Sequence, residues 1–104
     1  FDVSDISIFL AADAGNIGAV KKHLASGENV NSQDPELATP LHYAASGGHK
    51  EVADFFIEKG ATVNALGVHG TPLDNAIRQN HTEVAELLRK HGGKTGEELK
   101  AEGK

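Results

Sequence analysis

The sequence predicts an all-α fold, in which helix-turn-helix units stack into a solenoid and are joined by short hairpin-like loops. The main observation is an internal repeat: residues 39–45 read TPLHYAA, and residues 71–77, which begin 32 positions later, read TPLDNAI. A weaker copy in residues 6–32 keeps several of the same apolar residues and glycines at an offset of 33. A period in this range is typical of solenoids built from helical repeats.

The first helix of each complete copy has a clear beginning. Thr39 and Thr71 are good N-cap residues, and Pro40 and Pro72 follow at the first helical position, where the missing N–H costs nothing. Asp74 lies three residues after Thr71, where an acidic side chain suits the positive end of a helix. We therefore expect one helix to begin at Pro40 and another at Pro72.

A turn and a second helix should follow each first helix. Gly15, Gly48 and Asn80 are residue types that tolerate a positive φ, which a tight turn between helices often requires. Residues 52–57 then place apolar side chains in the i, i+1, i+4, i+5 pattern of one helical stripe. Glycines end the second helices at positions 27, 60 and 92. Helices of about ten residues are unstable alone in water, so stability must come from stacking.

The two outer copies carry residues that suit the ends of a stack. We expect Phe56 and Ile57 of the middle copy to be buried between repeats. In the first copy His23 takes the place of Phe56. In the last copy Arg89 takes the place of Ile57, so both His23 and Arg89 should be partly exposed at the edges of the stack. Residues 95–98 read TGEE, a capping-box pattern that predicts a short final helix before a charged tail.

These motifs together resemble the ankyrin-repeat family. The blocks TPLHYAA, GH-x-EV and GA-x-VN occur in register, and the resemblance covers roughly residues 6–95. It implies a single ankyrin-repeat domain over residues 1–104. Its expected parts are repeat one at about 4–32 as the N-terminal cap, repeat two at about 33–65, repeat three at about 66–95 as the C-terminal cap, and a polar tail at 96–104.

Composition supports one compact domain and argues against several kinds of protein. The 104 residues are 38% hydrophobic, enough for one elongated core, and the absence of cysteine excludes disulfides and thiolate chemistry. No apolar run approaches the roughly 18 residues of a membrane span. A net charge of −5 without a basic stripe disfavours nucleic-acid binding. A cytoplasmic location is favoured, but the chain begins at Phe1 rather than Met, so a removed signal stays open.

Three patterns that could indicate chemistry have plainer interpretations. Residues 93–95 read GKT, like the end of a phosphate-binding loop, but Leu88 stands where that motif needs Gly and a helix precedes it. His49 and His81 should lie about 10 Å apart in stacked repeats, whereas zinc ligands lie about 2.1 Å from the metal. The serines lie in no Gly-x-Ser-x-Gly motif. We therefore expect no enzyme activity, metal or cofactor.

The family resemblance implies recognition of a protein partner. Ankyrin repeats usually bind partners through their loop tips and the inner face of their first helices. The predicted inner face and tips carry Asp13, Asp34 and Glu36 against one base, Arg78, while most lysines lie on the opposite side. We therefore expect the partner to be neutral to basic at the contact, and we expect the protein to be a monomer. His69 is the histidine most available to a partner. The partner-binding candidates are Asp13, Gln33, Glu36, Leu37, Ser46, Leu66, Val68, His69, Arg78 and Gln79.

Two features of the loops leave alternatives open. Leu37 stands where the family has a glycine, because the turn tends to need a positive φ, so either the turn is remodelled or Leu37 tolerates the strain. The loop of residues 64–71 is one residue shorter than that of residues 31–39, so the two hairpins should differ in shape. Leu37, Leu66 and Val68 form either an apolar contact strip or local packing under the loops.

Two other functions also stay open. The chain could be a recognition or regulatory appendage of a larger enzyme whose catalytic domain lies outside it. It could also be an engineered protein made to study repeat folding; its irregular loops argue against a consensus design but leave an engineered variant open. The reading frame upstream of Phe1 would separate a free-standing adaptor from an appendage.

Overall fold

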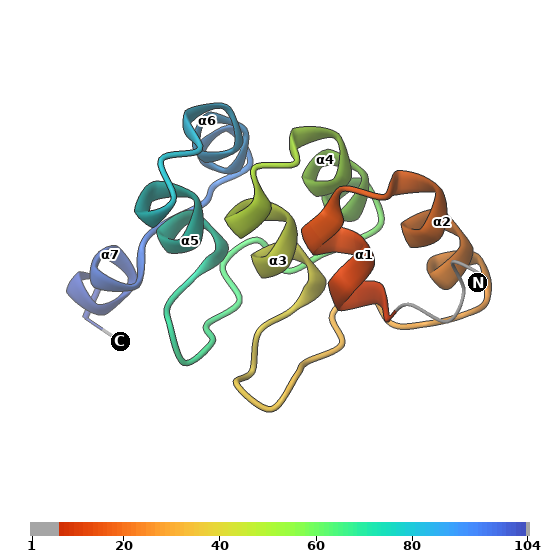
Figure 1. Cartoon of the computed structure of the whole chain (residues 1–104). Helices are drawn as coiled ribbons and strands as arrows, with labels where there is room; N and C mark the ends of the chain where they lie inside the picture. The colour runs from red at the N-terminus through yellow and green to blue at the C-terminus, as the bar shows by residue number, and fades with distance from the viewer. Residues whose placement is uncertain (1–6, 104) are drawn as a thin grey trace.

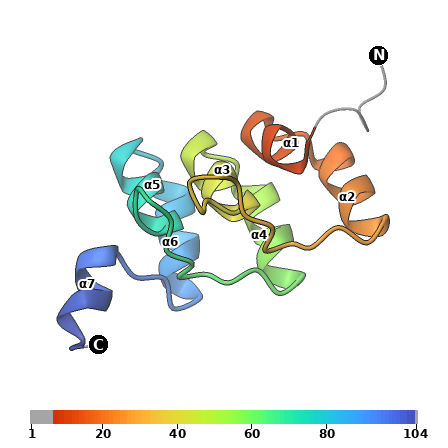
Figure 2. The same cartoon turned by 90° about the horizontal axis from the view of Figure 1, so that it is seen from below.

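Residues 7–103, which the computed structural model describes, form a two-layered stack of helices without a regular strand. Helices α1, α3 and α5 lie side by side in one row, and α2, α4 and α6 form a second row (Figure 1, Figure 2). The stack is elongated, with extents of 45 × 25 × 21 Å. The helices are α1 Ile8–Ala14, α2 Ile17–Ala25, α3 Pro40–Gly47, α4 Lys50–Glu58, α5 Pro72–Arg78, α6 Thr82–Lys90 and α7 Gly96–Ala101. The expected all-helical solenoid is confirmed, while the expected start of repeat one, at about residue 4, lies outside the described residues.

The first helices begin where the capping residues predict. In α5, the Thr71 hydroxyl accepts a hydrogen bond from the Asp74 amide at 3.2 Å, and Asp74 Oδ2 accepts from the Thr71 amide at 2.9 Å. In α3, His42 takes the place of that acid, because its Nδ1 accepts from the Thr39 amide at 2.9 Å. Both helices begin with proline at the first position, as the sequence predicts.

The glycines of the helix-to-helix turns permit the turn and also allow close contact between neighbouring repeats. Gly15 and Gly48 adopt φ values of 73° and 76°. A Cβ on Gly15 would lie 2.5 Å from Nδ1 of His49, and a Cβ on Gly48 would lie 2.5 Å from Nδ1 of His81. Each glycine therefore makes room for the imidazole ring of the next repeat. In the third repeat Asn80 fills this place, with a φ of 63°.

Burial in the second helices corrects part of the end-cap prediction. Phe56 is fully buried as expected, but Ile57 is only partly buried, and His23 is 8% exposed rather than at a partly exposed edge. The reason is that one register position, held by His23, Phe56 and Leu88, faces the core in all three repeats. The next position along the helix lies at the flank of the core, and only there does the last repeat place an exposed residue, Arg89.

The structure also shows the turn at Leu37, the shape of the second loop tip and the C-terminal helix. Leu37 has a φ of 66°, so the first tip keeps its turn and Leu37 tolerates the strain. The second tip has a different shape, with an isolated antiparallel bridge between Gly67 and Gly70. The expected short final helix is present as α7, which a salt bridge of 2.6 Å between Arg89 and Glu98 ties to α6.

Candidate functional site

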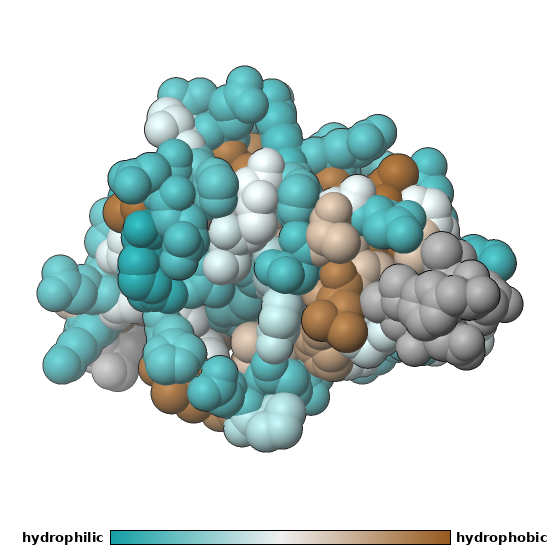
Figure 3. Space-filling model, in the orientation of Figure 1, coloured by the Kyte–Doolittle hydropathy of each residue, from teal (hydrophilic) through white to brown (hydrophobic). Residues whose placement is uncertain are grey.

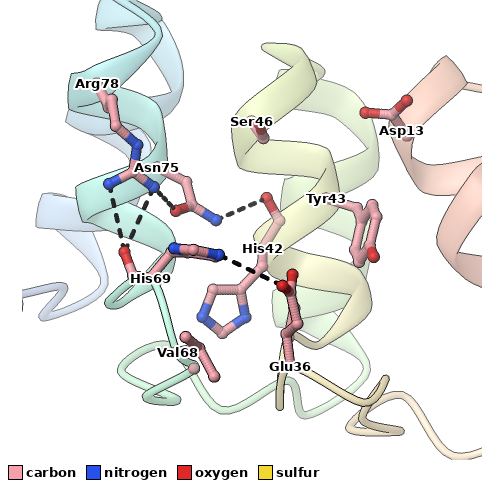
Figure 4. A pocket seen from close by; sticks show the side chains of 11 residues that line it. Asp13, Glu36, His42, Tyr43, Ser46, Val68, His69, Asn75 and Arg78 are labelled. Atoms are coloured by element: carbon pink, nitrogen blue, oxygen red, sulfur yellow. Dashed lines mark hydrogen bonds and ion pairs between the residues drawn. The ribbon is translucent and has the colours of Figure 1, made fainter.

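A cavity of about 320 Å³ opens on the face formed by the first helices and the loop tips (Figure 4). Helices α1, α3 and α5 supply its upper walls, and the tips at residues 33–38 and 65–70 supply the rest. Figure 4 shows Arg78 on one side of the cavity and Asp13 on the other. The residues that line it are Asp13, Glu36, Ala38, His42, Tyr43, Ser46, Gly67, Val68, His69, Asn75 and Arg78.

The two loop tips are joined to each other beside this cavity. The Val68 amide donates a hydrogen bond of 2.9 Å to the Glu36 carbonyl, so backbone connects one hairpin to the next. The side chains of the same region also meet, since Nε2 of His69 lies 3.6 Å from Oε2 of Glu36. His69 is therefore exposed and has Glu36 beside it. The tips act as one surface rather than as two independent loops.

Tyr43 presents a neutral phenol on the acidic side of the cavity. Its hydroxyl donates a hydrogen bond to the Asp34 carboxylate, and its ring packs against Phe9 with 5.3 Å between ring centroids. The hydrogen bond to Asp34, together with burial and the nearby charges of Glu36 and Asp13, raises the pKa of Tyr43 to about 12. Burial opposes ionisation of Asp34, but the hydrogen bonds from Tyr43 and two backbone amides outweigh it and lower the pKa of Asp34.

Titration of the phenol should report this contact directly, because the chain contains a single tyrosine. We expect the ultraviolet absorbance of tyrosinate to rise with a midpoint near pH 12 in the folded protein. Because the pKa of Tyr43 is raised on folding, its contribution to stability is complete below pH 10 and is lost as the pH rises toward 12. Asp34→Asn should move the midpoint back toward about 10. A midpoint near 10 in wild-type protein that circular dichroism shows to be folded would contradict the contact.

The opposite wall of the cavity is built from a chain of hydrogen bonds that leads into the core. The Arg78 guanidinium donates to the His69 carbonyl from both terminal nitrogens, each at 3.3 Å, and to Oδ1 of Asn75. Nδ2 of Asn75 donates to the His42 carbonyl at 3.4 Å, and Nε2 of His42 donates to the Gly70 carbonyl at 2.9 Å. The Arg78 guanidinium is therefore held by hydrogen-bond acceptors of the same wall.

The ten partner-binding candidates fall into two groups. Those that line the cavity are Asp13, Glu36, Ser46, Val68, His69 and Arg78. Those that lie outside it but are exposed are Gln33, Leu37, Leu66 and Gln79. The apolar tip residues Leu37, Leu66 and Val68 are 48%, 59% and 64% exposed, so none of them is buried under the loops. Figure 3 shows apolar surface at the lower edge, where the loop tips lie, bordered by hydrophilic residues.

Five residues that line the cavity are not among the ten candidates: Ala38, His42, Tyr43, Gly67 and Asn75. Helical spacing could have found two of them, because residues three apart share a helix face. Tyr43 lies three positions before the candidate Ser46, and Asn75 lies three positions before the candidate Arg78. His42 serves both the core and the cavity wall.

The patterns that could indicate chemistry have structural roles. Nε2 of His49 donates to the Asp13 carbonyl at 2.7 Å, and within residues 7–103 no three metal-ligating side chains gather. In the GKT segment, the Lys94 amide donates to Oδ1 of Asn64 at 2.7 Å, and the Thr95 hydroxyl caps α7. This segment is therefore a helix end followed by an N-cap. Within the part of the chain that the structure describes, no helix is long and apolar enough to cross a membrane.

Comparison with known proteins finds one matching family and relatives among different enzymes. The chain matches the family model of ankyrin repeats in three copies over residues 8–98. It is 40% identical over 89 residues to the palmitoyltransferase Hip14 of Drosophila melanogaster, a match that covers 84% of this chain and 14% of that protein. It is 37% identical over 93 residues to the palmitoyltransferase ZDHHC13 of Homo sapiens (88% and 15%). It is 35% identical over 86 residues to the mitochondrial glutaminase liver isoform of Mus musculus (80% and 14%).

A solved structure agrees with the stack of helices described above. The crystal structure of the human ASB11 ankyrin repeat domain superposes with a TM-score of 0.79 and 38% sequence identity, covering 84% of this chain and 40% of that one. The chain spans about 14–15% of the length of the three curated relatives named above. With three helix pairs stacked in register and a family model that matches most of its length, the chain belongs to the ankyrin-repeat family.

Proposed function

We propose that this protein is a non-enzymatic interaction module that binds a protein partner through its loop tips and the concave face of its first helices. Ankyrin repeats are generally protein-interaction modules, and their fold is typically non-catalytic. The observation that supports the proposal is the make-up of the cavity: the first helices and both loop tips line it, and the same tips carry the exposed side chains of Leu37, Leu66 and Val68. The module needs no cofactor, and we expect it to act as a monomer on a protein rather than on nucleic acid or a membrane.

The tip residues supply the binding energy in this proposal. Leu37, Leu66 and Val68 are exposed, and burying apolar surface yields roughly 25 cal/mol per Å². The charges of the same face, Asp13 and Glu36, mainly steer a partner that is neutral to basic at the contact. The inner helix positions carry small residues that offer few strong contacts, namely Ala14, Ser46 and Gly47. We therefore expect a dissociation constant on the order of micromolar.

Two double variants, one in the loop tips and one on the second helices, test which face binds the partner. We expect Leu37→Asp combined with Leu66→Asp to abolish binding of a partner captured from lysate, because both apolar anchors become charged. Aspartate tolerates a positive φ better than leucine does, so the Leu37 turn should survive the change. The matched control, Lys22→Glu with Lys50→Glu on exposed sites of α2 and α4, should keep the partner. Loss of binding in the control, with retention in the tip variant, would place the partner on the other face.

A second candidate function is a recognition appendage of a larger enzyme. One observation favours it: the matched segment is a small part of each curated relative, and those relatives are named as palmitoyltransferases and a glutaminase. In that case the same face would bring a protein substrate or a regulator to a catalytic domain elsewhere. The full reading frame on both sides of this segment decides between the two candidates.

A further inference from the structure

We propose that the cavity receives a lysine or arginine side chain of an extended segment of the partner, held between the carboxylates of Asp13 and Glu36 beside the Tyr43 ring. This inference rests on the proposed function, and it names the chemistry that the concave face selects. The cavity is bounded by α1, α3, α5 and both loop tips, so each of these elements contributes to its charge.

The acidic groups of the cavity come from two different elements. Asp13 comes from α1 and Glu36 from the first tip, and Tyr43 lies between them in Figure 4. Among residues 7–103 the Asp13 carboxylate has no hydrogen-bond or ion-pair partner, since His49 contacts only its backbone carbonyl. A third carboxylate, Asp34, is bonded to the Tyr43 hydroxyl. The negative charges of all three act on this hydroxyl, which stays protonated at neutral pH.

The positive groups near the cavity leave this acidic side open to a cation from the partner. Arg78 lies on the opposite wall, where the His69 carbonyl and the Asn75 side chain hold its guanidinium. His69 lies 3.6 Å from Glu36 and is 65% exposed, so an incoming cation can compete with it for the carboxylate. Burial lowers the pKa of His42, which therefore adds no positive charge at neutral pH. The cavity thus has an acidic side and a separate basic wall.

The size and lining of the cavity suit one long basic side chain. Ligand pockets commonly have volumes of about 300–1,000 Å³, and 320 Å³ is at the lower end of that range. Lysine and arginine pack an aliphatic stem on apolar surface and keep the charged head near polar groups. Val68 and the Tyr43 ring offer such a surface, and an aromatic face also attracts a cation. An apolar neighbour of that basic residue in the partner could contact the exposed Leu37 and Leu66 at the tips.

A selection from a random library of phage-displayed peptides tests the inference without a known partner. We expect peptides that bind the wild-type protein to share a lysine or arginine close to an apolar residue. Exchanging that base for glutamine in a synthetic peptide should weaken binding by about fivefold or more, and added salt should reduce the difference. Calorimetry with purified protein measures both effects.

Charge-neutral variants of the protein complete the experiment. Asp13→Asn with Glu36→Gln should remove the preference for the basic peptide over its glutamine form. The matched control, Glu58→Gln with Glu86→Gln, removes the same charge from exposed sites of α4 and α6 and should keep the preference. Circular dichroism checks that both variants are folded.

The outcomes separate this inference from the proposed function. One outcome is that the selected peptides contain no lysine or arginine and yet fail to bind the Leu37→Asp, Leu66→Asp variant. That result would overturn the inference that the cavity receives a basic side chain, and it would support the proposed binding face. Peptides that bind with equal affinity to every variant would overturn both proposals. A basic peptide whose preference survives Asp13→Asn with Glu36→Gln, or a selection that enriches no peptide, would also overturn the inference.

Discussion

Phe56→Ala is expected to remove a large part of the stability of the protein. The Phe56 side chain is fully buried in α4, the second helix of the middle repeat, which packs against helices of both neighbouring repeats. Truncating a buried phenylalanine costs about 3–5 kcal/mol through lost contacts and a cavity, and a domain of this kind has only about 5–15 kcal/mol in total. Chemical denaturation followed by circular dichroism should show a midpoint shifted strongly to lower denaturant.

The adjacent residue gives the matched control for this variant. Phe55 is only partly buried, and its ring lies under the ammonium groups of Lys21 and Lys59, each 5.5 Å from the ring centroid. Phe55→Ala should therefore cost about 1 kcal/mol, mainly from the lost cation–π contacts and surface packing. If Phe55→Ala destabilised the protein more than Phe56→Ala did, the assigned core face of α4 would be wrong.

His42→Ala is expected to be nearly as damaging, although the residue is polar. The ring is 3% exposed; its Nδ1 accepts from the Thr39 amide, and its Nε2 donates to the Gly70 carbonyl in the loop before the next repeat. Alanine leaves a buried amide and a carbonyl without their partners and opens a cavity, which should cost about 2–5 kcal/mol. His69→Ala, at an exposed histidine, should change stability by less than about 0.5 kcal/mol.

The pH dependence of stability provides a second measurement on His42. Burial lowers the pKa of His42 below its ordinary value of 6.5, although the hydrogen bond to the Gly70 carbonyl acts in the opposite direction. At a pH between the unfolded and the folded pKa of His42, the unfolded chain binds a proton that the folded ring does not. The contribution of the neutral ring to the free energy of unfolding is therefore complete above pH 6.5 and is lost as the pH falls through the lower pKa of the folded state. His42→Ala should lose this part of the acid sensitivity, and an unchanged pH profile would argue against a buried neutral ring.

The helices were predictable because their ends depend on nearby residues. Thr71 and Asp74 satisfy each other within one turn, and the residue types at positions 48 and 80 permit the positive φ of the turns. The burial of single residues was less predictable, as His23 and Ile57 show. A polar residue at a core position was interpreted as the mark of an outer edge, but that register position faces the core in the first repeat too, so His23 is buried.

The candidate site was only partly predictable for a related reason. Position in the repeat indicated which tips and helix faces reach the concave side, and Asp13, Ser46 and Arg78 do line the cavity. No pattern in the sequence indicated that Tyr43 would donate to Asp34, since the two are nine positions apart and belong to different elements. Helical spacing alone would have added Tyr43 to the candidates, but not its hydrogen bond.

The repeat and the order of the helices follow from the sequence, because capping, turn conformation and apolar periodicity act over a few residues and recur at each copy. The face that carries the loop tips came from the resemblance to the ankyrin-repeat family. Only the tertiary structure decided how the tips meet, through the Val68 amide on the Glu36 carbonyl, and how Asp13 and Arg78 come to face each other across one cavity. These contacts join residues about 30 or more positions apart. Their geometry depends on how far each repeat is shifted and rotated against the next, and that is set by the packing of whole helices rather than by any local motif.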